Sequence, residues 1–190
     1  MKKFKILLAF IAFGTLFSFN NVDEAADKKI NWVSIDEAIE LQKKEPKKII
    51  MDVYTTWCGP CKMLDKNTFQ NADVVEYVNE HFYAVKFNAE GNETVNYKDK
   101  TYKNPNYDPA KANRRNSPHE FSRALGVRAY PSIVFFDEDG KVITQPITGY
   151  KKPQGLELYL KLFKTDKYKE MTTQEKFNEY YQNFEPTFKE

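Results

Sequence analysis

The sequence predicts an α/β fold in which helices flank both faces of a mixed central sheet. Residues 49–54 and 83–88 are apolar runs typical of buried strands, and the helical segment between them indicates a parallel crossover. Residues 132–136 and 141–144 flank an acidic turn that ends in glycine, which is typical of an antiparallel hairpin. A crossover followed by a hairpin places both strand directions in one sheet.

Four helical segments complete this fold. Capping boxes at residues 34–37 and 117–120 begin the first and third helices, and Pro118 stands at the first helical position of the third. Gly126 closes that helix. Helical spacing in the second segment extends from Met63 to Val78. In the fourth, apolar residues recur at i, i+3, i+4 and i+7, namely Leu156, Tyr159, Leu160 and Phe163.

Two segments extend the compact domain, which we place at residues 27–164. An insertion at 89–116 follows the strand that ends at Asn88 and contains a short hairpin between residues 94 and 103. Residues 165–190 are predicted to be a helical extension that begins with a capping box at 172–175. Aromatic residues keep helical spacing along it and are expected to pack against the domain: Phe177, Tyr180, Tyr181 and Phe184.

The first residues have the pattern of a secretory signal. A basic start is followed by an uncharged apolar run from Ile6 to Phe19, shorter than the roughly 20 residues of a membrane-spanning helix. We therefore assign residues 1–26 to a signal peptide and expect export to the periplasm or cell envelope. The cleavage site is poorly marked, so an uncleaved segment that tethers the protein remains an alternative.

Charge and composition exclude some classes of function. The 190 residues suffice for one globular domain, and 29 basic and 27 acidic side chains are mixed along them to give a net charge of +2. No basic patch of the kind that binds nucleic acid is visible. We therefore expect no nucleic-acid partner.

The chain has 2 cysteines, Cys58 and Cys61. A secreted scaffold stapled by disulfides would show several widely spaced pairs, so one close pair indicates redox chemistry. Half of a zinc site is the alternative, but there are no further cysteines, and His81 and His119 lack ligand spacing, so no metal is expected. We place His81 at a helix end and His119 as a solvated residue of a first turn.

Both cysteines stand at the turn between a strand and a helix. A cysteine at a helix amino terminus has its thiolate stabilised by the helix dipole and free N–H groups, which lowers its pKa. This position predicts that Cys58 is the nucleophile and that Cys61, one turn further, is more shielded and resolves the mixed disulfide. Pro60 stiffens the turn, while Gly59 allows close approach of a substrate backbone.

The motif Trp57-Cys58-Gly59-Pro60-Cys61-Lys62 is similar to the active site of the thioredoxin family. Further landmarks follow in matching order across residues 30–164, apart from the insertion: Asp52, Lys86, Tyr130-Pro131-Ser132 and Gly149. The resemblance implies a thioredoxin-like fold and a redox-active disulfide in place of a bound cofactor.

The resemblance also implies roles for these landmarks. Asp52 looks like the family's buried acid and Lys86 like the lysine beside it, so Asp52 is interpreted as the proton acceptor for Cys61, with a purely structural ion pair as the alternative. Pro131 looks like a cis proline that would present the backbone of Tyr130 to a bound peptide, unless it is trans and merely starts a strand. Trp57 is expected to shape the contact surface.

The predicted function is thiol-disulfide oxidoreduction through Cys58 and Cys61. The substrates would be disulfides of exported proteins or of a partner redox protein, with electrons from a membrane thiol carrier. An oxidase or isomerase with the same site is one alternative, and a non-catalytic binding module on the same fold is another. The insertion is expected at the cysteine edge of the sheet, where it either narrows or extends the substrate groove or forms a solvated loop.

Overall fold

The computed structural model describes residues 29–189. The predicted signal peptide at 1–26 lies outside this range. Within the described range, none of the helices combines the length and the apolar character needed to cross a membrane.

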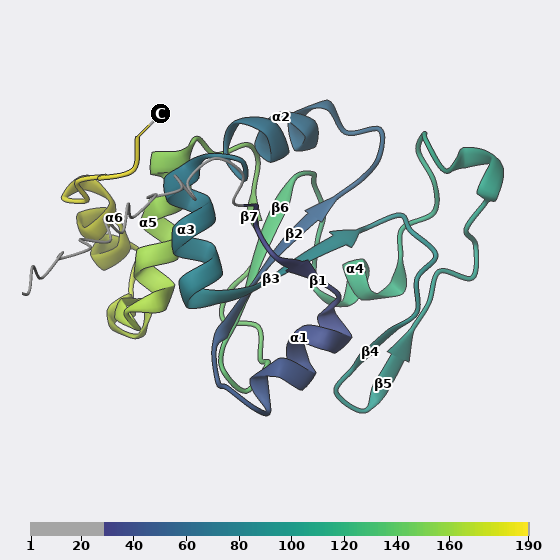
Figure 1. Ribbon diagram of the computed structural model, residues 1–190, viewed down its shortest axis with the longest axis horizontal. Coiled ribbons are helices and arrows are strands. Elements are labelled where there is room, and N and C mark those ends of the chain that lie inside the picture. Colours follow the sequence, from purple (N-terminus) through teal and green to yellow (C-terminus); the bar gives the residue numbers. More distant parts are fainter. Residues whose placement is uncertain (1–28, 190) are drawn as a thin grey trace, which may run out of the picture.

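The centre of the molecule is a 5-stranded mixed sheet in the order β1-β3-β2-β6-β7 (Figure 1). β1, β2 and β3 run parallel, whereas β6 is antiparallel to β2 and β7 is antiparallel to β6. The predicted mixed sheet is confirmed, although β1 was not expected. The strands are β1 (Trp32–Val33), β2 (Lys48–Tyr54), β3 (Phe82–Asn88), β6 (Ser132–Phe136) and β7 (Ile147–Thr148).

The hairpin after β6 differs from its prediction. Residues 141–144 form no strand, and one isolated bridge joins Val142 to Phe136. The strand that completes the sheet is β7, which begins after Pro146. A proline has no N–H to donate to a ladder, so regular pairing resumes only beyond it.

Helices cover both faces of the sheet and bury two apolar clusters. Alternate residues of β2 point to opposite faces: Ile50 lies in the cluster beneath α2, α3 and α5, whereas Met51 lies in the cluster beneath α1 and α4. The helices are α1 (Ile35–Gln42), α2 (Gly59–Asn67), α3 (Ala72–His81), α4 (Glu120–Ala124), α5 (Pro153–Lys164) and α6 (Gln174–Gln182), with short 3-10 turns at Pro109–Lys111 and Lys167–Glu170.

The starts of three helices, α3, α6 and α4, depart from the sequence interpretation. The continuous spacing from Met63 to Val78 is divided into α2 and α3, because Asn71 caps α3 by accepting hydrogen bonds from the N–H groups of Asp73 and Val74. The C-terminal α6 is capped by Thr173 rather than Thr172.

α4 begins two residues later than the capping box indicated, and His119 is its N-cap. The side chain is fully buried, so the prediction of a solvated histidine is wrong. Its Nδ1 accepts from the N–H of Phe121 at 3.0 Å, its Nε2 lies 2.8 Å from the carbonyl oxygen of Glu93, and its ring contacts Phe87. These tertiary contacts override the local capping signal. His81 ends α3, as predicted.

The insertion is partly folded into the domain. Its hairpin consists of β4 (Val95–Tyr97) and β5 (Lys100–Tyr102), within the predicted 94–103 range. Val95 and Tyr97 are buried in the cluster beneath α1 and α4, and the Tyr97 hydroxyl donates to the carbonyl of Gly140 at 2.6 Å. The hairpin is therefore not a solvated loop.

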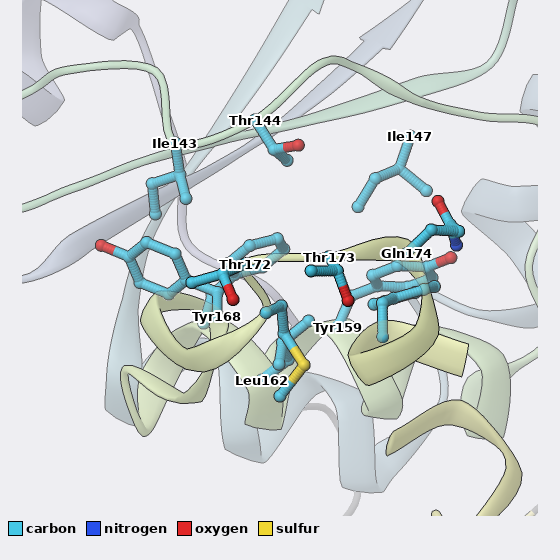
Figure 2. A pocket seen from close by; sticks show the side chains of 12 residues that line it. Ile143, Thr144, Ile147, Tyr159, Leu162, Tyr168, Thr172, Thr173 and Gln174 are labelled. Carbon is cyan, nitrogen blue, oxygen red and sulfur yellow. The ribbon is translucent and has the colours of Figure 1, made fainter. Parts of the chain in front are cut away.

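The C-terminal segment packs back on the domain, as its aromatic spacing predicts. Phe177 stacks on Tyr159 of α5, whereas Tyr181 is 59% exposed. A hollow of about 510 Å³ lies between this segment and the chain around the start of β7. Figure 2 shows Ile143 and Ile147 facing the hollow from the side opposite the segment. No cysteine or carboxylate is among its lining residues.

Candidate active site

The two cysteines form a disulfide at the amino terminus of α2, with an S–S distance of 2.05 Å. β2 ends at Tyr54, and Cys58 is the N-cap residue of the helix, with Pro60 in the first turn. Its Sγ accepts a hydrogen bond from the N–H of Cys61 at 3.1 Å. The nucleophile predicted from sequence therefore stands where the free N–H groups of a helix start converge.

Both sulfur-bearing residues are buried, with 3% of Cys58 and 5% of Cys61 exposed. The expectation that Cys61 is the more shielded is therefore wrong for this disulfide form, since the bond holds the two side chains together. What distinguishes them is the hollow that each borders. Cys58 lines an open groove, whereas Cys61 lines a smaller cavity that also reaches Asp52.

The groove beside Cys58 has a volume of about 440 Å³. It is lined by four of the predicted contact residues, by Cys58, and by residues from the insertion, from the loop at 128–130 and from the segment before α4. The predicted contact residues in it are Trp57, Gly59, Pro60 and Tyr130. The ring of Trp57 lies edge-on to that of Tyr130, with 6.1 Å between their centroids.

Pro131 is next in the chain to Tyr130, which lines the groove, but does not line the groove itself. The Tyr130–Pro131 peptide bond is cis, as the resemblance implied, and the proline itself is buried. Its carbonyl accepts from the N–H of Gly149 at 2.9 Å. Because Ser132 pairs with Val53 near the end of β2, this loop lies at the same sheet edge as the cysteines.

Asp52 is buried beneath α2, with 2% of its surface exposed. It pairs in register with Lys86 of β3, and the Lys86 Nζ lies 3.9 Å from its Oδ2. The direct ion-pair partner of Lys86 is instead Asp65 of α2. Within the described part of the chain, Asp52 Oδ1 has no hydrogen-bond partner.

This environment shifts the pKa of Asp52 upward. Burial is the largest cause and raises the pKa of its carboxyl to about 7, since it disfavours the charged form; Lys86 opposes the shift and Asp65 adds to it. A cavity of about 170 Å³ borders Asp52, Cys61 and Lys86. The site therefore holds a carboxyl that exchanges a proton near neutral pH on the inner side of the cysteine pair.

The insertion contacts the cysteine edge directly. Glu90 Oε2 accepts from the indole Nε1 of Trp57 and from the N–H of Asn116, each at 2.7 Å. The hydroxyl of Thr56 donates to the carbonyl of Ala112 at 2.7 Å. The insertion thus lies beside the active-site turn, where the parallel strands were expected to deliver it.

Comparisons with known proteins agree with this geometry. The profile of the thioredoxin-like domain matches residues 35–164, which is most of the chain. The chain belongs to the thioredoxin-like family. A thioredoxin-fold protein from Helicobacter pylori superposes on this thioredoxin-like chain with a TM-score of 0.56 at 20% identity, over 83% of this chain and 89% of that chain. A proposed disulphide isomerase from Bacteroides thetaiotaomicron superposes at 0.50 with 28% identity, over 73% of this chain and 95% of that one.

Curated relatives are much longer than this thioredoxin-like chain. The thiol:disulfide interchange protein DsbD of Actinobacillus pleuropneumoniae is 29% identical over 121 residues, which cover 61% of this chain and 17% of that protein. The DsbD of Colwellia psychrerythraea is 24% identical over 144 residues, which cover 75% of this chain and 20% of that protein. The chain therefore matches one segment of each relative.

Sequence reasoning missed several residues of this thioredoxin-like site. Asp65 follows Cys61 by four positions, so helical spacing alone places both on one face of α2. Glu90 lies two residues beyond the end of β3, at the edge where the cysteines stand. Arg115 carries no such signal, because it reaches the groove only through the path of the insertion. Within the described residues, no cluster of histidine, cysteine and carboxylate side chains could hold a metal ion.

Proposed function

We propose that this thioredoxin-like chain is an exported thiol-disulfide oxidoreductase that reduces or exchanges protein disulfides. The observation that carries the proposal is the Cys58–Cys61 disulfide at the start of α2, with a groove on the Cys58 side and a buried acid on the Cys61 side. The matches to two interchange proteins named DsbD support this class of reaction. The apolar run near the start of the chain supports export to the periplasm or cell envelope.

The reaction begins with the reduced pair. The Cys58 thiolate attacks one sulfur of a partner disulfide, a new S–S bond forms between the two proteins, and the partner's second sulfur leaves as a thiolate that takes up a proton. Asp52 accepts the proton of Cys61 across the cavity that they share. Cys61 then attacks Cys58, the intermolecular bond breaks, and the partner departs with two added electrons.

The remaining predicted residues have supporting roles in this proposal. Trp57, Gly59, Pro60 and Tyr130 form the contact surface, and Pro131 fixes the loop that presents the Tyr130 backbone. Lys86 limits the pKa of Asp52. No bound cofactor takes part, because the disulfide itself carries the electrons. A dithiol donor must reduce it again, and we propose a membrane thiol carrier for that role.

Insulin reduction with dithiothreitol tests the proposal. We expect the wild-type protein to accelerate precipitation of the insulin B chain and Cys58→Ser to abolish the acceleration, since no nucleophile remains. Cys61→Ser is the matched control, because it keeps Cys58 and should accumulate a mixed disulfide that a non-reducing gel reveals. Full acceleration by Cys58→Ser would contradict the proposal.

The direction of electron flow is a separate part of the proposal. The likeness to a proposed disulphide isomerase keeps oxidation or isomerisation through the same cysteines as the second candidate. Equilibration of the pair with glutathione buffers gives its reduction potential. A value near −270 mV supports a reductase, whereas a value near −120 mV supports an oxidase.

A further inference from the structure

The groove beside Cys58 carries two exposed arginines from different loops. Arg115 belongs to the insertion, and Arg128 precedes the cis proline by three residues. In residues 29–189, neither forms an ion pair with a carboxylate. Two guanidinium groups that form no ion pair within the described residues therefore line the same groove as the nucleophile.

Arg115 is held in a defined place. The carbon centre of its guanidinium lies 4.9 Å from the centroid of the Trp57 ring. Stacking of this kind occupies the flat face of a guanidinium and leaves its N–H edge open to a carboxylate. Glu90 fixes the indole through its 2.7 Å hydrogen bond, so the Arg115 guanidinium is held over a fixed ring in the groove that Cys58 also lines.

Several other charged side chains of the insertion have partners of their own. Glu90 is the one acid lining the groove, is 7% exposed, and accepts from Trp57 and Asn116. The Arg114 guanidinium donates to the carbonyl of Ala110, and Lys111 pairs with Asp108. The two positive charges of Arg115 and Arg128 outweigh the one negative charge of Glu90, so the lining of the groove has a net positive formal charge.

We propose that Arg115 and Arg128 select partner segments that carry aspartate or glutamate next to the reacting cysteine. This inference rests on the proposed function and names the substrate class of the same groove. A carboxylate on either side of the partner sulfur would meet a guanidinium edge, which favours bidentate hydrogen bonding. Lysine at the same positions would face like charge and be disfavoured.

The test uses three synthetic peptides with one cysteine each, blocked as a mixed disulfide with 2-thiopyridine. The cysteine is flanked on both sides by aspartate, asparagine or lysine. The reduced protein transfers two electrons to the peptide disulfide and becomes the Cys58–Cys61 disulfide, while the peptide leaves as a thiol and the pyridine as 2-thiopyridone. The absorbance of 2-thiopyridone, followed with peptide in excess, gives the second-order rate constant for one turnover. We expect the order aspartate, asparagine, lysine, and a smaller spread at high salt because exposed charges are screened.

Substitutions test whether Arg115 and Arg128 cause the preference for the aspartate peptide. We expect the double variant R115Q/R128Q to lower the aspartate-to-lysine ratio of this second-order rate constant by about fivefold, and each single variant to lower it by about twofold. Arg114→Gln is the matched control, since it removes the same charge from the insertion away from the groove, and should leave the ratio unchanged. Thermal unfolding confirms that each variant is folded.

Equal rates for all three peptides with the wild-type protein would overturn the inference while leaving the oxidoreductase proposal intact. A decrease of the aspartate-to-lysine ratio in Arg114→Gln as large as that in Arg115→Gln would also overturn the inference, because the overall charge of the insertion would then explain the preference. Failure of the reduced wild-type protein to release 2-thiopyridone from any peptide would instead reject the proposed function, and the inference with it.

Discussion

Asp52 is the residue at which burial and charge oppose each other most clearly. Its carboxyl lies under α2 with 2% exposure, and its register partner Lys86 is drawn away by a direct ion pair with Asp65. A lysine 3.9 Å away compensates the buried charge only in part. The result is a group that is protonated in the folded protein at pH values where it is ionised in the unfolded chain.

This shift has a consequence for stability. Because the pKa of Asp52 is raised from 3.8 to about 7, the folded state holds a proton that the unfolded state has lost between these values, so stability falls as the pH rises through that window. We expect Asp52→Asn to raise the free energy of unfolding of the oxidised protein at pH 8, by at most about 4 kcal/mol. This increase in the free energy of unfolding should become smaller toward pH 4, where Asp52 is protonated in the folded protein. Urea unfolding at both pH values measures it.

Asp65→Asn is the matched control for that experiment. This substitution removes the negative charge of Asp65, which raises the pKa of Asp52. It also breaks the ion pair between Asp65 and Lys86, so that Lys86 can approach Asp52. The pKa of Asp52, followed by carboxyl-carbon NMR, should therefore fall below about 7. A gain in stability for Asp52→Asn that is equal at pH 4 and pH 8 would show that burial of the charge is not its cause.

At the scale of elements, the insertion is joined to the domain through its hairpin. Tyr97 is 7% exposed, contacts the rings of Phe121 and Phe136, and donates its hydroxyl to the carbonyl of Gly140. The rest of the segment runs on to the groove, where it supplies Arg115. One end of the insertion therefore serves packing and the other borders the active site.

We expect Tyr97→Ala to lower the free energy of unfolding by about 3 kcal/mol, because it leaves a cavity in the cluster beneath α1 and α4. Tyr97→Phe should cost about 1 kcal/mol, since it removes only the buried hydrogen bond. Thr101→Ala, an exposed position of the same hairpin, is the control and should change stability little. Equal effects of Tyr97→Ala and Thr101→Ala in urea unfolding would contradict the packing role.

The elements that were predicted well from the sequence are those whose own apolar pattern determines their secondary structure. β2 and β6 are nearly or wholly buried along their length, and α5 keeps its apolar spacing, so local sequence and tertiary position agree. β1 escaped prediction because two residues carry no periodicity. The start of α4 was misplaced because buried contacts of His119 outweighed a capping box.

The residues of the active site likewise fall into those that local sequence predicts and those that only tertiary contacts bring to the site. The cysteine pair, Asp52 and Pro131 stand at positions fixed by a motif or by strand register. The choice of Lys86 between Asp52 and Asp65 depends on side-chain reach between β3 and α2, which spacing along the chain does not encode. Glu90 and Arg115 join the site only because the insertion folds back to it.

At the scale of the whole molecule, the insertion and the C-terminal segment lie at opposite ends of the fold (Figure 1). Residues 187–189 are tied to the domain chiefly by Glu157 of α5, which is fully buried. Its carboxylate accepts from the N–H groups of Thr187 and Phe188 at 2.9 Å and pairs with Lys161 at 2.5 Å. Beyond Glu157, Asp73 accepts from the N–H of Lys189 at 2.7 Å, and the side-chain amides of Asn71 and Gln154 donate to the carbonyls of Lys189 and Phe188.

Burial opposes ionisation of Glu157, but hydrogen bonds from Lys161, Thr187 and Phe188 outweigh it and lower its pKa below 4.5. For an acid with a lowered pKa, the stabilisation is present above the unfolded value and is lost as the pH falls through the folded one. The attachment of the C-terminal segment should therefore weaken as the pH falls below 4.5, whereas protonation of Asp52 stabilises the core at higher pH, as the pH falls from about 7 toward 3.8.

Glu157→Ala should loosen the attachment of the C-terminal segment without disturbing the cysteines. We expect faster amide hydrogen exchange across residues 174–189 and a loss of about 2 kcal/mol in the free energy of unfolding, because buried donors lose their acceptor. Glu157→Gln keeps one acceptor oxygen, so its exchange rates and its free energy of unfolding should lie between those of the wild-type protein and Glu157→Ala. Since the groove beside Cys58 is built from the active-site turn, the insertion and the loops around α4, insulin reduction should be unchanged. A parallel loss of activity and of exchange protection would instead show that the two ends are coupled through α5 and the sheet.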